Sequence, residues 1–223
     1  RLQGGTLDLS SRTLNGRVTV AGTTTIAANG GSINGTLAIA SGTITVADDF
    51  DANVTNLKGG TLNLDNKDLT GPVNVLVSST ISATSNNASI DALTIRTGTL
   101  LTIAGSNFSI SSLNMAGGNL ALASFVLTNT GNITISGSGT ISSTGTGRIY
   151  TSNTTTVNGG TLTLNNAELT TQNLTFSSAN DIITTNGGIF SFNNNDNTIT
   201  GAATDRHING TIRVYIDNGN KND

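Results

Sequence analysis

A short phrase, two glycines followed by alternating polar and apolar residues, returns four times and constrains the fold more than any other feature. The copies occupy Gly4–Leu9, Gly59–Leu64, Gly117–Leu122 and Gly159–Leu164. Adjacent glycines let the backbone turn a corner, and the alternation that follows sends both leucines of each copy to the same side. Each copy therefore predicts a corner followed by a half-buried β-strand.

The spacing of apolar residues extends the repeat well beyond the phrase. The copies that begin at Gly4 and Gly59 place apolar residues at the same six offsets, 3, 5, 10, 14, 16 and 22. A second type of unit, Ser32–Ile39, is matched by Ser89–Ile95. The phrase at Gly59 begins 55 positions after the first copy and 58 before the third, so two alternating units predict about 28 residues each. Repeats of this length that carry short strands and no helical pattern are typical of solenoids.

We therefore expect one all-β domain over residues 1–216, a β-solenoid of about eight three-sided coils and about 40 Å in length, with a polar tail or linker at 217–223. The phrase also predicts that its first leucines form one buried ladder along the rod. These are Leu7, Leu62, Leu120 and Leu162. The alternative fold is a β-sandwich subunit of the pilus type, polymerised by strand donation. Repeated offsets favour the solenoid, because a sandwich strand has no reason to repeat the spacing of another strand.

Composition excludes several classes of function. The net charge of −3 and the pI of about 4.9 argue against nucleic acid or an anionic membrane as a partner. No apolar run approaches the roughly 20 residues of a membrane helix. The chain has no cysteine, which excludes a disulfide framework and a thiolate metal site. A cysteine-free chain rich in Thr, Asn, Ser and Gly is typical of bacterial surface proteins, and we expect an extracellular, mature or excised segment.

Few residues could carry chemistry. Asp48, Asp49 and Asp51 lie at a predicted corner and are the candidate Ca²⁺ ligands, or the carboxylates of a polysaccharide-cleaving β-helix. Lysine and arginine total 10 and none clusters with these aspartates in the sequence. The single histidine, His207, lies near Asp205, but serine and threonine are so abundant that a triad would arise by coincidence. We predict no catalytic residue and no cofactor other than this calcium possibility.

Alternating threonines raise the hypothesis of ice binding. Thr161 and Thr163 point outward from one predicted strand. If the copies of the phrase stack on one another, the positions equivalent to Thr163 are Asp8, Asn63 and Ala121. The predicted outward ladder is therefore irregular, which argues against an ice-binding face.

The stretch Thr156–Ala167 resembles the strand repeat of autotransporter passenger domains and of filamentous-haemagglutinin-like adhesins. The resemblance implies a right-handed β-helix displayed on a bacterial surface, where it acts in adhesion or as a stalk. It transfers no catalytic residue to this chain.

The sequence thus predicts a non-catalytic structural or adhesive cell-surface protein, as a segment of an adhesin stalk or a subunit of an extracellular filament. Expected partners are flanking domains or a second copy stacked head to tail, and a surface polysaccharide or host ligand, without nucleic acid or membrane insertion. The alternative is a polysaccharide-active β-helix enzyme or a carbohydrate-binding module. The enzyme requires Asp48, Asp49 or Asp51 to meet a basic side chain in space.

Overall fold

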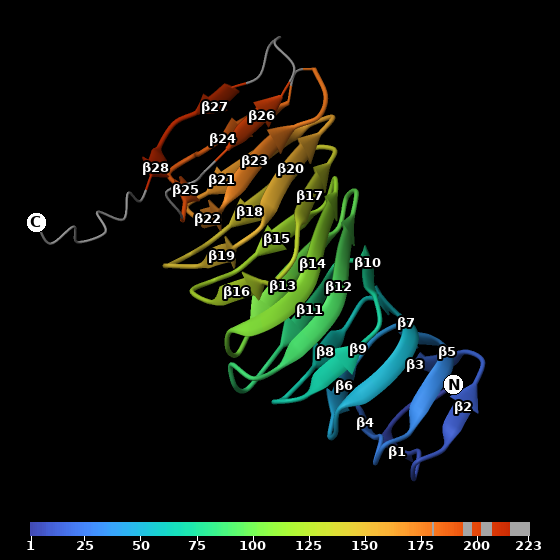
Figure 1. Cartoon of the computed structure of the whole chain (residues 1–223). Coiled ribbons are helices and arrows are strands. Elements are labelled where there is room, and N and C mark those ends of the chain that lie inside the picture. The colour runs from blue at the N-terminus through green and yellow to red at the C-terminus, as the bar shows by residue number, and fades with distance from the viewer. Residues whose placement is uncertain (180, 194–197, 202–206, 215–223) are drawn as a thin grey trace, which may run out of the picture.

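The computed structural model is a three-sided rod of β-strands, which Figure 1 shows along its length. It describes residues 1–179, 181–193, 198–201 and 207–214, so the predicted tail at 217–223 lies outside the described residues. The described part contains no helix, and hence none long and apolar enough to cross a membrane. The predicted β-solenoid is confirmed. The sandwich alternative is wrong, because neighbouring strands pair in parallel throughout, whereas sandwiches are built from antiparallel sheets. The right-handed sense of coiling stays a prediction.

The first face of the rod is a sheet of eleven strands. In order along the rod they are β1 (Gly5–Asp8), β4 (Thr24–Ala27), β6 (Thr43–Val46), β8 (Thr61–Asn63), β11 (Ser79–Ser82), β13 (Leu100–Ala104), β15 (Asn119–Ala121), β18 (Gly139–Ser142), β21 (Thr161–Asn165), β24 (Ile182–Thr184) and β27 (His207–Asn209).

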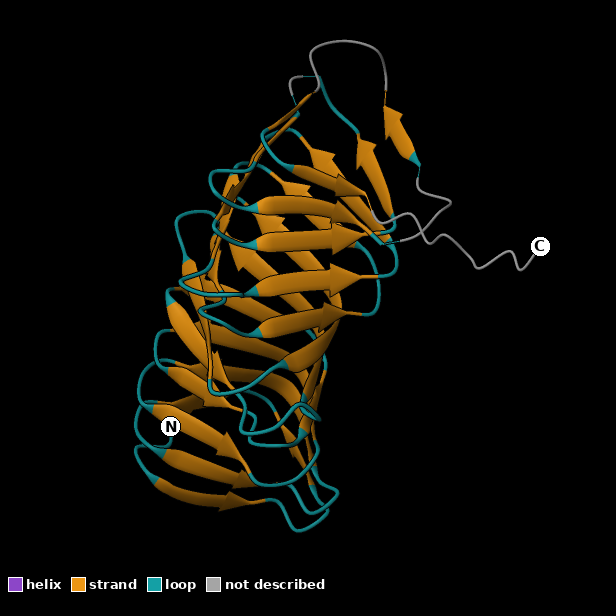
Figure 2. Cartoon of the chain, turned by 90° about the vertical axis from the view of Figure 1, so that its left-hand side faces the viewer, coloured by secondary structure: helices purple, strands orange, loops and turns teal. Residues whose placement is uncertain are grey.

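The second and third faces join into one sheet of 17 strands, because four long strands run around the corner between them. These are β5 (Ser32–Ile39), β7 (Phe50–Lys58), β12 (Ser89–Arg96) and β14 (Phe108–Ala116). The second face also contains β2 (Thr13–Asn15), β9 (Asp68–Thr70), β16 (Val126–Asn129), β19 (Arg148–Thr151), β22 (Glu168–Thr171), β25 (Ile189–Phe192) and β28 (Ile212–Val214). The third also contains β3 (Val18–Val20), β10 (Val73–Val77), β17 (Ile133–Ser136), β20 (Thr154–Asn158), β23 (Asn173–Phe176) and β26 (Ile199–Gly201). Figure 2 shows the strands stacked across the rod.

The core fills the inside of the rod, because alternation turns every second side chain inward. On the first face Leu62 stacks between Ile44 and Ile81, and all three are 0% exposed. Each such side chain contributes about 1.5–3 kcal/mol through burial. The interior also holds a few polar groups, and the buried hydroxyls of Thr24 and Thr155 have no hydrogen-bond partner among the residues that the structure describes.

The solenoid has about ten turns, so the prediction of eight coils of about 28 residues is wrong. Three turns, not two, separate the first two copies of the phrase, because Gly5 pairs with Thr24, Thr24 with Ile44, and Ile44 with Leu62. Each of these turns is therefore close to 19 residues. At about 4.8 Å a turn, ten turns make a rod of about 48 Å.

The predicted ladder of leucines is also wrong, although their inward orientation is right for the three that lie away from the end of the rod. Leu62, Leu120 and Leu162 are buried, and Leu7 is partly buried at the first turn. Their strand neighbours are Ile26 for Leu7, Ile44 and Ile81 for Leu62, Leu101 and Ile141 for Leu120, and Gly139 and Ile183 for Leu162. The three turns from position 5 to position 62 take 57 residues, two more than the sequence repeat of 55. A shift of two residues keeps each leucine inside the rod, because alternate side chains of a strand share a face. It moves the leucine to the next inward position along its strand.

Candidate functional site

Of the three aspartates singled out by the sequence, Asp48 and Asp49 lie at the corner between the first and second faces, where each accepts a hydrogen bond from the backbone. Asp48 Oδ2 accepts the N–H of Asn29 at 3.3 Å, and Asp49 Oδ1 accepts the N–H of Asp68 at 3.1 Å. These amides belong to the turn before and the turn after. Asp51 is exposed at the start of β7.

No acid–base or metal cluster forms around these aspartates among the described residues. The single ion pair within that part of the chain joins Arg213 to Glu168, so no aspartate of the corner pairs with a basic side chain. No group of three or more His, Asp or Glu side chains in the same ranges is arranged to hold a metal ion. The calcium site at Asp48, Asp49 and Asp51 stays a prediction, and so does the absence of catalysis at these residues.

An earlier turn of the same corner carries Asp8, a carboxyl with a lowered pKa. Asp8 Oδ1 accepts hydrogen bonds from Asn29 Nδ2 at 3.1 Å, from the Ser10 backbone at 2.9 Å and from the Ser10 hydroxyl at 3.1 Å. The Asn29 amide, followed by the Ser10 donors, holds the pKa of the Asp8 carboxyl below its ordinary value. These bonds favour the charged form of an exposed group, and the bond from Asn29 connects adjacent turns.

His207 begins β27, where it is exposed and pairs with Ile182 of the turn below. The carboxylate considered with it, Asp205, lies outside the described residues. Another carboxylate, missed by the sequence analysis, is fully buried. Asp181 accepts backbone N–H groups from Gly159 and Gly160 at 2.7 and 3.2 Å and from Ser178 at 2.7 Å. It fixes the corner made by the glycine pair.

The outward threonines of the first face are more regular than the sequence analysis predicted. The strand neighbours of Thr163 are Thr140 and Thr184, not the residues of the other copies of the phrase. Lower on the same face Thr43, Thr61, Thr80 and Thr102 occupy four consecutive turns. The predicted irregularity arose because each copy of the phrase is offset by two residues from the strand neighbours of the previous copy.

The second face carries three neighbouring hollows that share lining residues, and together we call them the second-face groove. The first, of about 250 Å³, is lined by Asn86, Asn107, Phe108, Ser109, Val126, Thr128 and Arg148. The next, of about 260 Å³, is lined by Arg148, Tyr150, Glu168, Thr170 and Asn193. The third, of about 220 Å³ at the corner with the first face, is lined by Gly145, Thr146, Gly147, Asn166, Ala167, Glu168, Gly187, Gly188 and Ile189. Arg148 is shared by the first two hollows and Glu168 by the last two.

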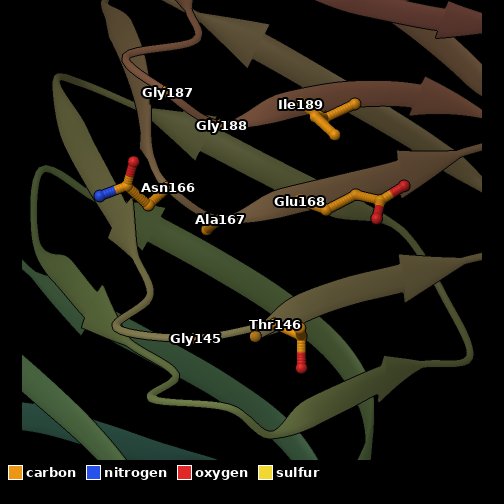
Figure 3. Close-up of a pocket in the computed structure, with 9 residues that line it drawn as sticks. Gly145, Thr146, Asn166, Ala167, Glu168, Gly187, Gly188 and Ile189 are labelled. Atoms are coloured by element: carbon orange, nitrogen blue, oxygen red, sulfur yellow. The ribbon is translucent and has the colours of Figure 1, made fainter.

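Glycines open the corner hollow, because the backbone of adjacent turns passes too close for a side chain. A Cβ on Gly188 would lie 2.4 Å from the Ala167 carbonyl oxygen, and one on Gly147 would lie 2.7 Å from the Ala123 carbonyl oxygen. Figure 3 shows Glu168 at this hollow, where the corner leads into β22.

Strand register sets the side chains of the groove. Arg148 of β19 pairs with Glu168 of β22, and Tyr150 pairs with Thr170. One outward column runs through Ser109, Thr128, Tyr150, Thr170, Ser191 and Arg213. Tyr150 is 39% exposed, so its ring is available at the surface.

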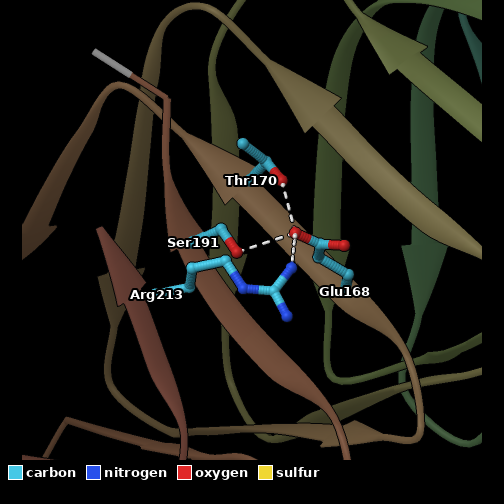
Figure 4. Close-up of polar contacts among 4 residues, drawn as sticks. All are labelled: Glu168, Thr170, Ser191 and Arg213. Carbon is cyan, nitrogen blue, oxygen red and sulfur yellow. Dashed lines mark hydrogen bonds and ion pairs between the residues drawn. The ribbon is translucent and has the colours of Figure 1, made fainter. Parts of the chain in front are cut away.

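Glu168 is the polar centre of the groove, as Figure 4 shows. Its Oε1 accepts the Ser191 hydroxyl at 2.7 Å and the Thr170 hydroxyl at 3.4 Å, and Arg213 Nη1 lies 3.9 Å away. Arg148 is exposed, and in the described part of the chain its guanidinium forms no ion pair or hydrogen bond. The groove thus offers a free guanidinium, an aromatic ring, amides and hydroxyls side by side.

Comparison with known proteins adds no relative to this picture. No protein-family model, no curated protein sequence and no solved structure matches the chain.

Proposed function

We propose that the protein is a non-catalytic structural and adhesive rod displayed outside the cell, as a stalk segment of an adhesin or a subunit of a filament. The observation that carries the proposal is the hydrogen-bonded parallel ladder, which runs on all three faces over about ten turns. Such a body holds its two ends apart and presents long, regular faces, as a stalk or filament requires. The resemblance of Thr156–Ala167 to surface adhesins supports the same role.

The edge strands support self-association or contact with flanking protein. Among the described residues, β1 of the first turn pairs only with β4, and β2 pairs only with β5. Leu14 of β2 is 39% exposed. Open strand edges recruit other strands, so we propose that a flanking segment or a second copy stacked head to tail covers this edge.

Cells that display the protein test the adhesive role. Compared with cells displaying the Leu62→Asp variant, whose core is broken, they are expected to adhere more strongly to glass coated with one or more of a panel of polysaccharides. The polysaccharide chains should keep their length. Adhesion equal to that of the core variant on every surface contradicts the proposal.

An enzyme assay on the same panel tests the competing function. The variant with alanine at Asp48, Asp49, Asp51 and His207 is expected to behave like the native protein. Chains shortened by the native protein but not by this variant would show that the corner aspartates or the histidine act in catalysis.

A second candidate function, ice binding, is favoured by the threonine columns of the first face. Nine consecutive strands of that face, β4 to β24, contain no charged residue. Thr61 and Thr80 stack in register, and β-branched side chains are restricted in rotation, so their hydroxyl and methyl groups form a fixed array with about 4.8 Å between turns.

Ice-growth inhibition tests this candidate. Thr80→Tyr on the first face is expected to abolish the activity, whereas Thr128→Tyr on the second face, in a column that already holds Tyr150, should retain it. Absence of inhibition by the native protein, or equal loss in both variants, removes ice binding as a function.

A further inference from the structure

We propose that the second-face groove binds an acidic polysaccharide, with Arg148 as the contact for a sugar carboxylate. This inference rests on the proposed adhesive role and names the ligand that the rod would hold. It concerns binding only and includes no bond-breaking step.

The shape of the groove fits a chain laid along the rod. The two hollows that share Arg148 cross β14, β16, β19 and β22 in succession. From Ser109 to Thr170, which both line these hollows, the outward column covers three steps of register, a length of about 14 Å at the usual spacing of strands. An extended polysaccharide can therefore contact several turns at once, and many weak contacts add up along its length.

Charge identifies the class of sugar. Arg148 and Arg213 flank Glu168, so in this part of the groove two guanidinium groups face one carboxylate, although the whole chain has a net charge of −3. Glu168 Oε1 is already contacted by the Arg213 guanidinium and by two hydroxyls. The Arg148 guanidinium has no partner in the described ranges. A guanidinium binds a carboxylate through two parallel hydrogen bonds. The sugar that fits is a uronic acid.

The remaining lining suits the rest of a sugar ring. Tyr150 offers an aromatic face with a hydroxyl at its edge, and such side chains contact ligands through both parts. Asn107 uses its Oδ1 to accept the Val126 N–H at 2.7 Å, which leaves its amide N–H groups for sugar hydroxyls. The Thr128 hydroxyl lies in the same outward column as Tyr150.

The test is titration calorimetry with oligomers of polygalacturonate and with their methyl esters, which have the same backbone without the charge. The native protein is expected to bind the acid and to bind the ester at least about tenfold more weakly, a difference of about 1.4 kcal/mol. Arg148→Gln should weaken binding of the acid by a similar factor. Arg96→Gln, which removes an exposed arginine at the end of β12, outside the groove lining, should leave it unchanged.

Two further variants keep the outcome clear. Tyr150→Ala should weaken binding and Tyr150→Phe should retain most of it, because the ring survives. Equal affinity for acid and ester, equal loss in the Arg148 and Arg96 variants, or no binding by the native protein overturns the inference. If cells that display the protein still adhere to another surface in those cases, the ligand is not an acidic polysaccharide but the adhesive role stands. If the acid binds in solution and the cells do not adhere, only the adhesive role fails.

Discussion

The register of the first face can be measured with two double-mutant cycles. Leu62 and Ile81 are stacked neighbours with no exposed surface, so each change to alanine is expected to cost about 2–5 kcal/mol. Because the two side chains share one space, the effects of Leu62→Ala and Ile81→Ala should depart from additivity by about 0.5–3 kcal/mol. Leu62 and Leu120 belong to β8 and β15, three turns apart, which is about 14 Å. Their effects should add within about 0.5 kcal/mol.

Native-state hydrogen exchange is the suitable assay, because a solenoid opens locally and one free energy of unfolding does not describe it. The amides of β8 and β11 report the first cycle, and those of β8 and β15 report the second. Thermal melting monitored by circular dichroism provides the control that each variant still folds. Additive effects for Leu62 and Ile81 together with strong coupling between Leu62 and Leu120 would refute the register described above and restore the ladder predicted from the repeats.

Three further outcomes follow from single sites. An NMR titration should place the pKa of Asp8 below its ordinary value, and Asn29→Ala should raise that pKa. The stability from the hydrogen bonds to Asp8 is present above about pH 4 and is lost as the pH falls through the lowered pKa. Gly71→Ala should lower the melting temperature more than Gly98→Ala. Both glycines have a positive φ, 99° and 74°, but only at Gly71 would a Cβ meet a carbonyl oxygen, at 1.9 Å. Equal shifts in melting temperature would contradict this. Thr155→Val should raise the free energy of local opening at β20, measured by native-state hydrogen exchange, by about 1 kcal/mol, because it removes a buried hydroxyl that has no partner within the described part of the chain. A fall in this free energy would contradict that reasoning.

The fold class could be predicted from local chemistry. The alternation around Leu62 and Leu164 places both side chains inside, where the structure has them, and the glycine pairs fall at corners. The turn count could not be predicted, because the first three copies of the phrase recur after three turns and the fourth after two, and each spacing is two residues shorter than the turns that it covers. After a shift of two residues, inward side chains still point inward and outward ones still point outward. The pattern alone therefore cannot distinguish a unit of two turns from a unit of three turns.

The site was harder to predict than the fold. Asp48 and Asp49 were found because they are adjacent in the sequence, and adjacency is also typical of a corner that binds neighbouring backbone amides. The groove brings Arg148, Glu168 and Arg213 together from β19, β22 and β28. These positions are 20 and 45 residues apart, and only the correct register shows that they share one face.

The parallel ladder described above has a mechanical consequence for a tethered rod. Its hydrogen bonds lie along the long axis, so a load applied between the ends pulls each turn away from the next. A turn contributes about 4.8 Å to the folded length, but its roughly 20 residues extend to about 70 Å once released. Each turn that peels off extends to more than ten times the length that it had in the folded rod, while the remaining turns stay intact. The protein would yield under tension in small steps, and the attachment at its far end would be spared the peak of the force.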